Sequence, residues 1–225
     1  MINQYKVLAL IYPLKLDYEH PISFDVEVIV LGMDQWRRVN TRVPTSALFL
    51  CGSPIFLRGS IHWLGYRSVI SVVILAFDVH EEVFLEMEVP SAIVQASGYS
   101  LHVHGESLCL LDNRCSRDSG AVPFWVMKQY GEKQSWCKQF IIEIHDHSFR
   151  VLGFWKEDKI LIENIDGEMV SYDRKVRSTK VVLASEEGTY RVSKYDLAIP
   201  YMECLVLLKG SDGLESRVDG SSSNI

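Results

Sequence analysis

Two short histidine motifs have the spacing from which a metal site could be built. His102 and His104 are separated by one residue, and His145 and His147 flank Asp146. On a strand, side chains two residues apart point to the same face, as metal-binding histidine pairs often do. A metal site also needs a third or fourth ligand in register, and the other Asp, Glu and Cys residues show no ligand spacing. We therefore expect half-exposed strand histidines rather than a metal centre.

Motifs for nucleophilic or nucleotide chemistry are absent from the sequence. It contains no G-x-S-x-G elbow, no local signature around a cysteine, no G-x-G-x-x-G and no Walker loop. The carboxylate pairs Glu81-Glu82 and Glu186-Glu187 lie in polar, turn-like segments, where solvated charge is the ordinary role. A hydrolase would need two carboxylates, or a histidine pair with a further ligand, to converge in one cleft. The sequence therefore identifies no catalytic, cofactor-binding or metal-binding residue, and we expect neither enzyme activity nor a cofactor.

Tryptophans near predicted turns are the most distinctive side chains of the chain. Exposed, they would serve as binding anchors; buried, they would act as wedges between sheets, worth about a few kcal/mol each. Because they recur at repeat-related places, we favour the wedge and expect Trp63 and Trp136 to be mostly buried. The residues considered are Trp36, His62-Trp63, Trp125, Trp136 and Trp155.

Strand and turn signals recur four times along the chain. Each unit ends in an aromatic or β-branched residue, and these closing residues are Trp36, Phe84, Trp136 and Val181. Their spacing of roughly 45–50 positions is the period of a four-stranded propeller blade. Few windows show the apolar period of a helix. We therefore expect an all-β fold, a propeller-like array of consecutive antiparallel four-stranded sheets that is open or incomplete as a ring.

Composition excludes several classes of protein. The 225 residues are 48% hydrophobic and carry a net charge of −6 with interspersed signs, so no basic face for nucleic acid is visible. No apolar run approaches the roughly 20 residues of a membrane span. The five cysteines are odd in number and form no C-x-x-C pair, which is typical of a reducing compartment. We expect a cytoplasmic or nuclear protein that binds neither nucleic acid nor membrane.

Several co-linear pieces, spread over about nine-tenths of the chain, carry a resemblance to a known family. They are N-x-YKV at 3–7, VEVIVLGMDQWRRV, GSIHWL at 59–64, LAFDVHEEVFLEMEVP at 75–90, ESLCLL at 106–111, WVMKQYGEKQSW at 125–136 and VLGFWKEDKILIENIDGEMVSYDRK at 151–175. Together they make the chain resemble the F-box associated domain, the C-terminal interaction region of plant F-box proteins.

The resemblance implies a role in target recognition. In that family an N-terminal F-box docks onto the Skp-type adaptor of a cullin-based ubiquitin ligase, and the associated domain captures the substrate for ubiquitin-dependent protein degradation. The sequence begins at the YKV strand with no F-box before it. We therefore expect a protein-interaction module that binds a target protein and meets a Skp-type adaptor only if an F-box is supplied. The alternative is a glycan- or small-molecule-binding β-propeller, which exposed tryptophan platforms would support.

Residues 1–208 are expected to form the F-box associated β domain, with 203–208 as a closing strand. Residues 209–225, rich in Gly, Ser and Asp, are expected to form a disordered tail. Propeller-like domains bind through loops at one end. The candidate loops are Pro44–Pro54, Tyr66–Ser68, Asn113–Val122 and Glu186–Arg191. The sequence does not identify the individual substrate-binding residues.

Overall fold

The computed structural model describes most of the chain up to residue 183. The described residues are 5–11, 24–44, 49–68, 71–93, 98–112, 121–143, 149–156, 159–164 and 168–183. Within them the only helix is the single 3₁₀ turn η1 at Lys133–Ser135, and every other regular element is a strand. The all-β prediction is therefore confirmed.

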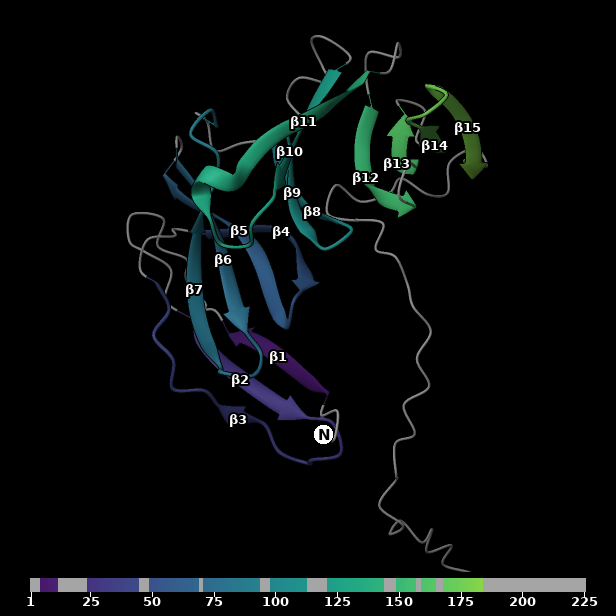
Figure 1. Ribbon diagram of the computed structural model, residues 1–225. Coiled ribbons are helices and arrows are strands. Elements are labelled where there is room, and N and C mark those ends of the chain that lie inside the picture. Colours follow the sequence, from purple (N-terminus) through teal and green to yellow (C-terminus); the bar gives the residue numbers. More distant parts are fainter. Residues whose placement is uncertain are drawn as a thin grey trace, which may run out of the picture.

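The strands form four antiparallel sheets that follow one another along the chain (Figure 1). The first blade has the order β1-β2-β3, with strands Lys6–Ile11, Asp25–Val30 and Arg37–Arg38. The second blade contains β4 to β7, at Phe49–Leu57, Ser60–Ser68, Ser71–Asp78 and Val83–Glu88. The third contains β8 to β11, at Tyr99–His104, Ser107–Asp112, Ala121–Met127 and Trp136–Glu143. The fourth contains β12 to β15, at Phe149–Lys156, Lys159–Asn164, Met169–Asp173 and Ser178–Leu183.

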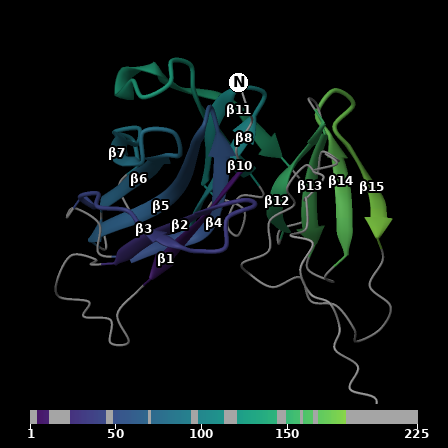
Figure 2. The ribbon, with the colours of Figure 1, turned by 90° about the horizontal axis from the view of Figure 1, so that it is seen from below.

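The first strands of the second, third and fourth blades lie next to one another, since β8 contacts both β4 and β12. The other strands of each blade extend outward from these three, as in a propeller. The first and fourth blades lie at opposite ends of the array in Figure 1, and Figure 2 shows the fourth blade standing to one side of the other three. The propeller-like array of consecutive sheets expected from the repeat is thus confirmed, and the described residues do not close it into a ring. One detail differs: the first blade has three strands among the described residues instead of four.

The period-two alternation of each strand explains how the blades stack. Alternate side chains of a strand point to opposite faces of its sheet, so a blade between two others buries both faces. In β6, Ile74 packs toward the third blade and Leu75 toward the first, and both are almost fully buried. This is why the sequence Ser71-Val-Val-Ile-Leu-Ala-Phe-Asp78 reads as a continuous apolar run rather than an alternating one.

Three hydrophobic clusters fill the three inter-blade spaces. The cluster between the first and second blades includes Phe24, Val26, Val28, Trp63, Leu75, Phe77 and Phe84. The cluster between the second and third includes Leu64, Tyr66, Ile74, Met87, Leu101, Leu110 and Trp136. The cluster between the third and fourth includes Leu111, Phe124, Ile142, Val151, Phe154, Ile160, Ile162 and Tyr172. Each cluster draws on two blades, so blade packing rather than any single sheet supplies the core.

The tryptophan wedge prediction holds for both residues on which it was based. Trp63 and Trp136 are each only 8% exposed and lie in neighbouring inter-blade clusters. Trp136 also donates a hydrogen bond from Nε1 to the Glu88 carbonyl of the second blade, at 2.9 Å. Trp125 is half-buried against the same cluster as Trp136. The wedge interpretation is wrong for Trp36, which is 47% exposed because it precedes the two-residue edge strand β3.

Two of the four predicted binding loops are wrong in whole or in part. Tyr66–Ser68 belongs to β5, where Tyr66 is buried because it continues the alternation that points Leu64 to the third blade. The second half of Pro44–Pro54 belongs to β4, in which a register shift between Cys51 and Ile55 accommodates Gly52 at φ +74°. Such a bulge lets Gly and Pro occur within a strand.

The other two predicted loops lie largely outside the described residues. Only the last two positions of Asn113–Val122 are described; they open β10, and Val122 is fully buried. The segment Glu186–Arg191, the expected closing strand at 203–208 and the expected tail at 209–225 lie outside the described residues.

Candidate interaction surface

The Glu81-Glu82 pair occupies the β6–β7 turn, where the two carboxylates have different surroundings. Asp78 Oδ1 accepts hydrogen bonds from the backbone N–H groups of His80 and Glu81, which fixes the turn. Glu82 takes a left-handed backbone conformation, φ +58°, and its carboxylate reaches Lys6 and Arg37 of the first blade. The turn therefore presents Glu82, not Glu81, to the neighbouring sheet.

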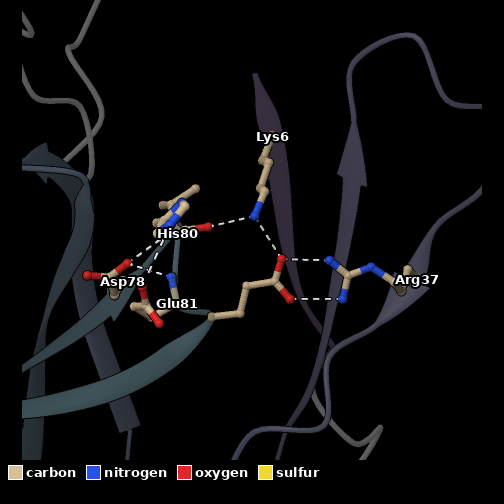
Figure 3. Close-up of polar contacts among 7 residues, drawn as sticks. Lys6, Arg37, Asp78, His80 and Glu81 are labelled. Atoms are coloured by element: carbon tan, nitrogen blue, oxygen red, sulfur yellow. Dashed lines mark hydrogen bonds and ion pairs between the residues drawn. The ribbon is translucent and has the colours of Figure 1, made fainter. Parts of the chain in front are cut away.

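Glu82 forms an ionic clamp between the first and second blades. Arg37 donates two hydrogen bonds to its carboxylate, at 2.6 and 2.8 Å, and Lys6 donates one at 2.8 Å (Figure 3). Lys6 also donates to the Val79 carbonyl at 2.8 Å. The hydrogen bonds from Arg37, followed by those from Lys6, lower the pKa of Glu82 to about 2. A general acid or base works best with a pKa near the working pH, so this carboxylate has a structural role.

The H-x-H motif faces the fourth blade rather than solvent. His102 and His104 project from one face of β8, as expected, and both contact the ring of Phe154. His104 stacks on that ring with centroids 4.6 Å apart. His102 is buried, which corrects the expectation of a half-exposed side chain, and its Nε2 lies 2.8 Å from the Ser100 hydroxyl. Burial lowers the pKa of His102 to about 4.

No group of three or more His, Cys, Asp or Glu side chains in the described part of the chain could hold a metal ion. The second motif, His145-Asp146-His147, lies outside that part. The two free cysteines that are described, Cys109 and Cys137, lie in β9 and β11. Burial raises the pKa of the Cys109 thiol to about 12, so it is not a reactive thiolate.

His62 is a second buried histidine, and the sequence does not predict its polar contact with another blade. His62 is fully buried in β5, and its Nε2 lies 2.7 Å from the hydroxyl of Tyr130 in the third blade. Its Nδ1 lies 3.3 Å from the Ile55 carbonyl, so a neutral ring can satisfy both nitrogens. Burial lowers the pKa of His62. The contact joins two blades that are distant in sequence, which local patterns do not show.

The outer face of the fourth blade, on which the described residues form no hydrophobic cluster, differs from the three packed interfaces. One face of this blade holds Ile160, Ile162, Val170 and Tyr172 against the third blade. The opposite face, here called the blade-4 face, is formed by Lys159, Ser171, Asp173, Ser178, Lys180 and Val182. These residues line a shallow depression of about 410 Å³. Where the inter-blade faces are apolar, this one combines charged groups and hydroxyls with Val181 and Val182 of the depression and with Leu161, which stands opposite Ser171.

The register of the strands determines where the charged groups of the blade-4 face lie. Lys159, Asp173 and Ser178 stand opposite one another across β13, β14 and β15, and Ser171 and Lys180 form the next row of the same face. Lys159 Nζ lies 4.0 Å from the Asp173 carboxylate. The other oxygen of Asp173 accepts backbone N–H groups of Lys175 and Val176, which fixes the β14–β15 turn. The depression therefore has one carboxylate, committed to the turn, between two lysines.

No helix in the described residues is long and apolar enough to cross a membrane.

Comparison with known proteins gives the family. A family model for the F-box associated beta propeller domain matches residues 1–194. The F-box/kelch-repeat protein At3g23880 of Arabidopsis thaliana is 25% identical over 162 residues, which is 71% of this chain and 42% of that protein. The F-box protein CPR1 of Arabidopsis thaliana is 24% identical over 196 residues, 76% of this chain and 46% of that protein. The chain thus spans less than half the length of these relatives. With four consecutive β-sheets stacked through apolar faces and a family match over residues 1–194, the chain belongs to the F-box associated beta propeller domain family.

Proposed function

We propose that this chain is a protein-interaction module, the target-recognition domain of an F-box type of protein. The observation that carries the proposal is the match of residues 1–194 to the F-box associated beta propeller domain. Relatives that are F-box proteins support it, because in such proteins one part of the chain must choose the target. The module would work by recognition alone, and ubiquitin transfer would occur on other subunits of a Skp–cullin ligase.

The geometry of the described residues is that of a rigid scaffold. Three apolar clusters and the Glu82 clamp hold the four blades in one arrangement. The titratable groups with the largest pKa shifts, Glu82, His102 and Cys109, are all engaged in packing or ion pairs. A scaffold of this kind supports binding at its surface loops and free faces. We propose no enzyme activity and no cofactor for it.

The remaining parts of the proposal concern the binding partners and the cellular compartment. The partner is a target protein, and a Skp-type adaptor joins only when an F-box is supplied. The free thiols described, Cys109 and Cys137, are compatible with a cytoplasmic or nuclear site of action. The glycan-binding alternative is less well supported, because Trp63 and Trp136 are buried and cannot serve as stacking platforms for sugar.

Affinity purification followed by mass spectrometry tests the proposal. The 225-residue chain is used as bait with and without an F-box grafted in front of Met1. We expect the same target protein with both baits, and the Skp-type adaptor with the fusion alone. Trp136→Ala, which removes a buried inter-blade side chain, is the control for dependence on the folded domain. Target recovery by neither bait, or equal recovery by the Trp136→Ala control, would refute the function.

A further inference from the structure

Positive charge is concentrated at one corner of an otherwise acidic chain. Residues 173–180, Asp-Arg-Lys-Val-Arg-Ser-Thr-Lys, contain four cations and one carboxylate, although the whole chain has a net charge of −6. They form the end of β14, the β14–β15 turn and the start of β15. Lys159 of β13 adds a fifth cation beside them, opposite Asp173 in the register. This corner includes the blade-4 face.

Several cations elsewhere in the described part of the chain have carboxylate partners. Lys6 and Arg37 pair with Glu82, Arg38 pairs with Asp25, and Lys133 pairs with Glu88. Each of these cations is therefore neutralised locally. By contrast, no carboxylate among the described residues lies within ion-pairing distance of Lys180 or Arg177. On the blade-4 face Lys180 thus has no carboxylate partner among the described residues, and Lys159 shares Asp173 with the β14–β15 turn.

We propose that the blade-4 face binds a short, extended acidic segment of a target protein, through carboxylates placed on Lys159 and Lys180. This inference rests on the proposed function and specifies the partner chemistry for it. Apolar contact would come from Val182, which is 44% exposed beside the lysines. The hydroxyl of Ser178, which is exposed in the same depression, can donate to a carboxylate or to a backbone carbonyl of the segment.

Strand geometry sets the spacing of the acidic residues. Lys159 is on β13 and Lys180 is on β15, with β14 between them. Along the strand direction the two lysines are offset by one register row, which is two residues. With strands separated by about 4.8 Å and a rise of about 3.3 Å per residue, their Cα atoms are about 12 Å apart. In an extended peptide, side chains at positions i and i+4 are about 13 Å apart and lie on the same face. An acidic segment with this spacing can reach both lysines at once.

Side-chain carboxylates fit this face better than a phosphate group. Asp173 lies between the two lysines, and its carboxylate is held in place by the turn. A phosphate carries close to two negative charges at neutral pH and would be repelled by Asp173 at short range. Single carboxylates on either side of Asp173 carry one charge each and are repelled less. The proposal therefore commits to Asp and Glu side chains of the target.

The direct test uses a fluorescein-labelled twelve-residue peptide, about twice the length of β15, with glutamate at every second position. A matched peptide has glutamine at the same positions. Fluorescence anisotropy is measured against the full 225-residue chain at low and high salt. We expect binding of the glutamate peptide at least about tenfold tighter than the glutamine peptide, and weaker at high salt because exposed charges are screened. Equal affinity for the two peptides, or no binding of either, would overturn the proposal.

Charge-reversal variants locate the site. The double variant Lys159→Glu, Lys180→Glu should weaken binding of the glutamate peptide at least about tenfold, since each reversal replaces an attraction with a repulsion. The matched control is the double variant Lys128→Glu, Lys138→Glu, which reverses two exposed lysines of the third blade and should change affinity less than about twofold. An equal effect of the two variants would show that only the net charge matters and would overturn the site.

A second measurement, in which the variant gains binding to a different peptide, distinguishes loss of the site from misfolding of the variant. The double variant should bind a lysine-containing version of the peptide at least about fivefold tighter than the parent chain does, because the face has become acidic. If the double variant has a native unfolding transition and still does not bind the lysine-containing peptide more tightly, the assignment of the blade-4 face as the site is contradicted. If the grafted F-box fusion still captures its target when carrying both reversals, the blade-4 face is wrong while the proposed function stands.

Discussion

Replacing Glu82 by Gln should loosen the first blade from the second and make stability depend on pH in a defined way. The carboxylate has an ordinary pKa of 4.5 and a folded pKa of about 2, lowered first by the hydrogen bonds from Arg37 and then by Lys6. Taken in full, the shift corresponds to roughly 3 kcal/mol at about 1.4 kcal/mol per pH unit. Arg37 is half-exposed and solvent screens its charge, so we expect a loss of about 1–2 kcal/mol at pH 7.

The sign of the pH dependence follows from the depressed pKa. A carboxyl group whose folded pKa lies below its unfolded pKa stabilises the fold above pH 4.5, and this stabilisation is lost as the pH falls toward 2. The parent chain and Glu82→Gln should therefore differ most at neutral pH and converge as the parent carboxylate is protonated. Urea unfolding followed by tryptophan fluorescence at pH 7, 5, 4 and 3 measures the difference in free energy of unfolding.

The matched control for this prediction is Asp25→Asn. Asp25 pairs with Arg38 within the first blade, and both side chains are more than half exposed. We expect this variant to lose less than about 0.5 kcal/mol, as is usual for surface ion pairs. A difference between parent and Glu82→Gln that stays constant from pH 7 to pH 3, or an equal loss in Asp25→Asn, would refute the clamp.

Three further predictions concern packing, a buried histidine and the ligase. Trp136→Ala should lose roughly 3–5 kcal/mol in urea melts, and Trp63→Ala a similar amount, whereas the exposed Trp36→Ala should lose less than about 0.5 kcal/mol. Burial holds the pKa of His102 at about 4, so the fold should lose up to about 3 kcal/mol as the pH falls from 6.5 to 4, and His102→Asn should flatten that part of the stability–pH profile. In pull-downs the bare chain should not bind a Skp-type adaptor, and a fusion with an F-box in front of Met1 should; micromolar binding by the bare chain would show that the docking function is misplaced.

Much of the fold could be predicted because each blade leaves a local signature. Strand alternation, the turn at Arg58-Gly59 and the closing positions Phe84 and Trp136 are all short-range features, and the structure confirms the blades that they delimit. The Arg58-Gly59 turn has positive φ at both positions, +50° and +79°, which glycine favours and which suits a tight hairpin. Such signals depend on neighbours in sequence, so one chain is enough to read them.

The contacts between blades could not be predicted in the same way. Glu82 reaches Lys6 across 76 positions of sequence, and His62 reaches Tyr130 across 68. Before the sheets are stacked, nothing distinguishes Glu82 from its neighbour Glu81. The same reason explains why the sequence predicts a loop at Tyr66: only the stacked third blade shows that its side chain is in the core. The blade-4 face also depends on register across three strands, which joins Lys159 to Lys180.

Direct binding of the target to the isolated chain tests the central claim most closely. The protein recovered with both baits is purified and titrated by calorimetry against the bare 225-residue chain and against the F-box fusion. If the β domain is the recognition module, both should bind with the same Kd, micromolar or tighter, because the F-box adds nothing to the target site. Binding by the fusion alone, or by neither protein, would contradict target recognition by this domain.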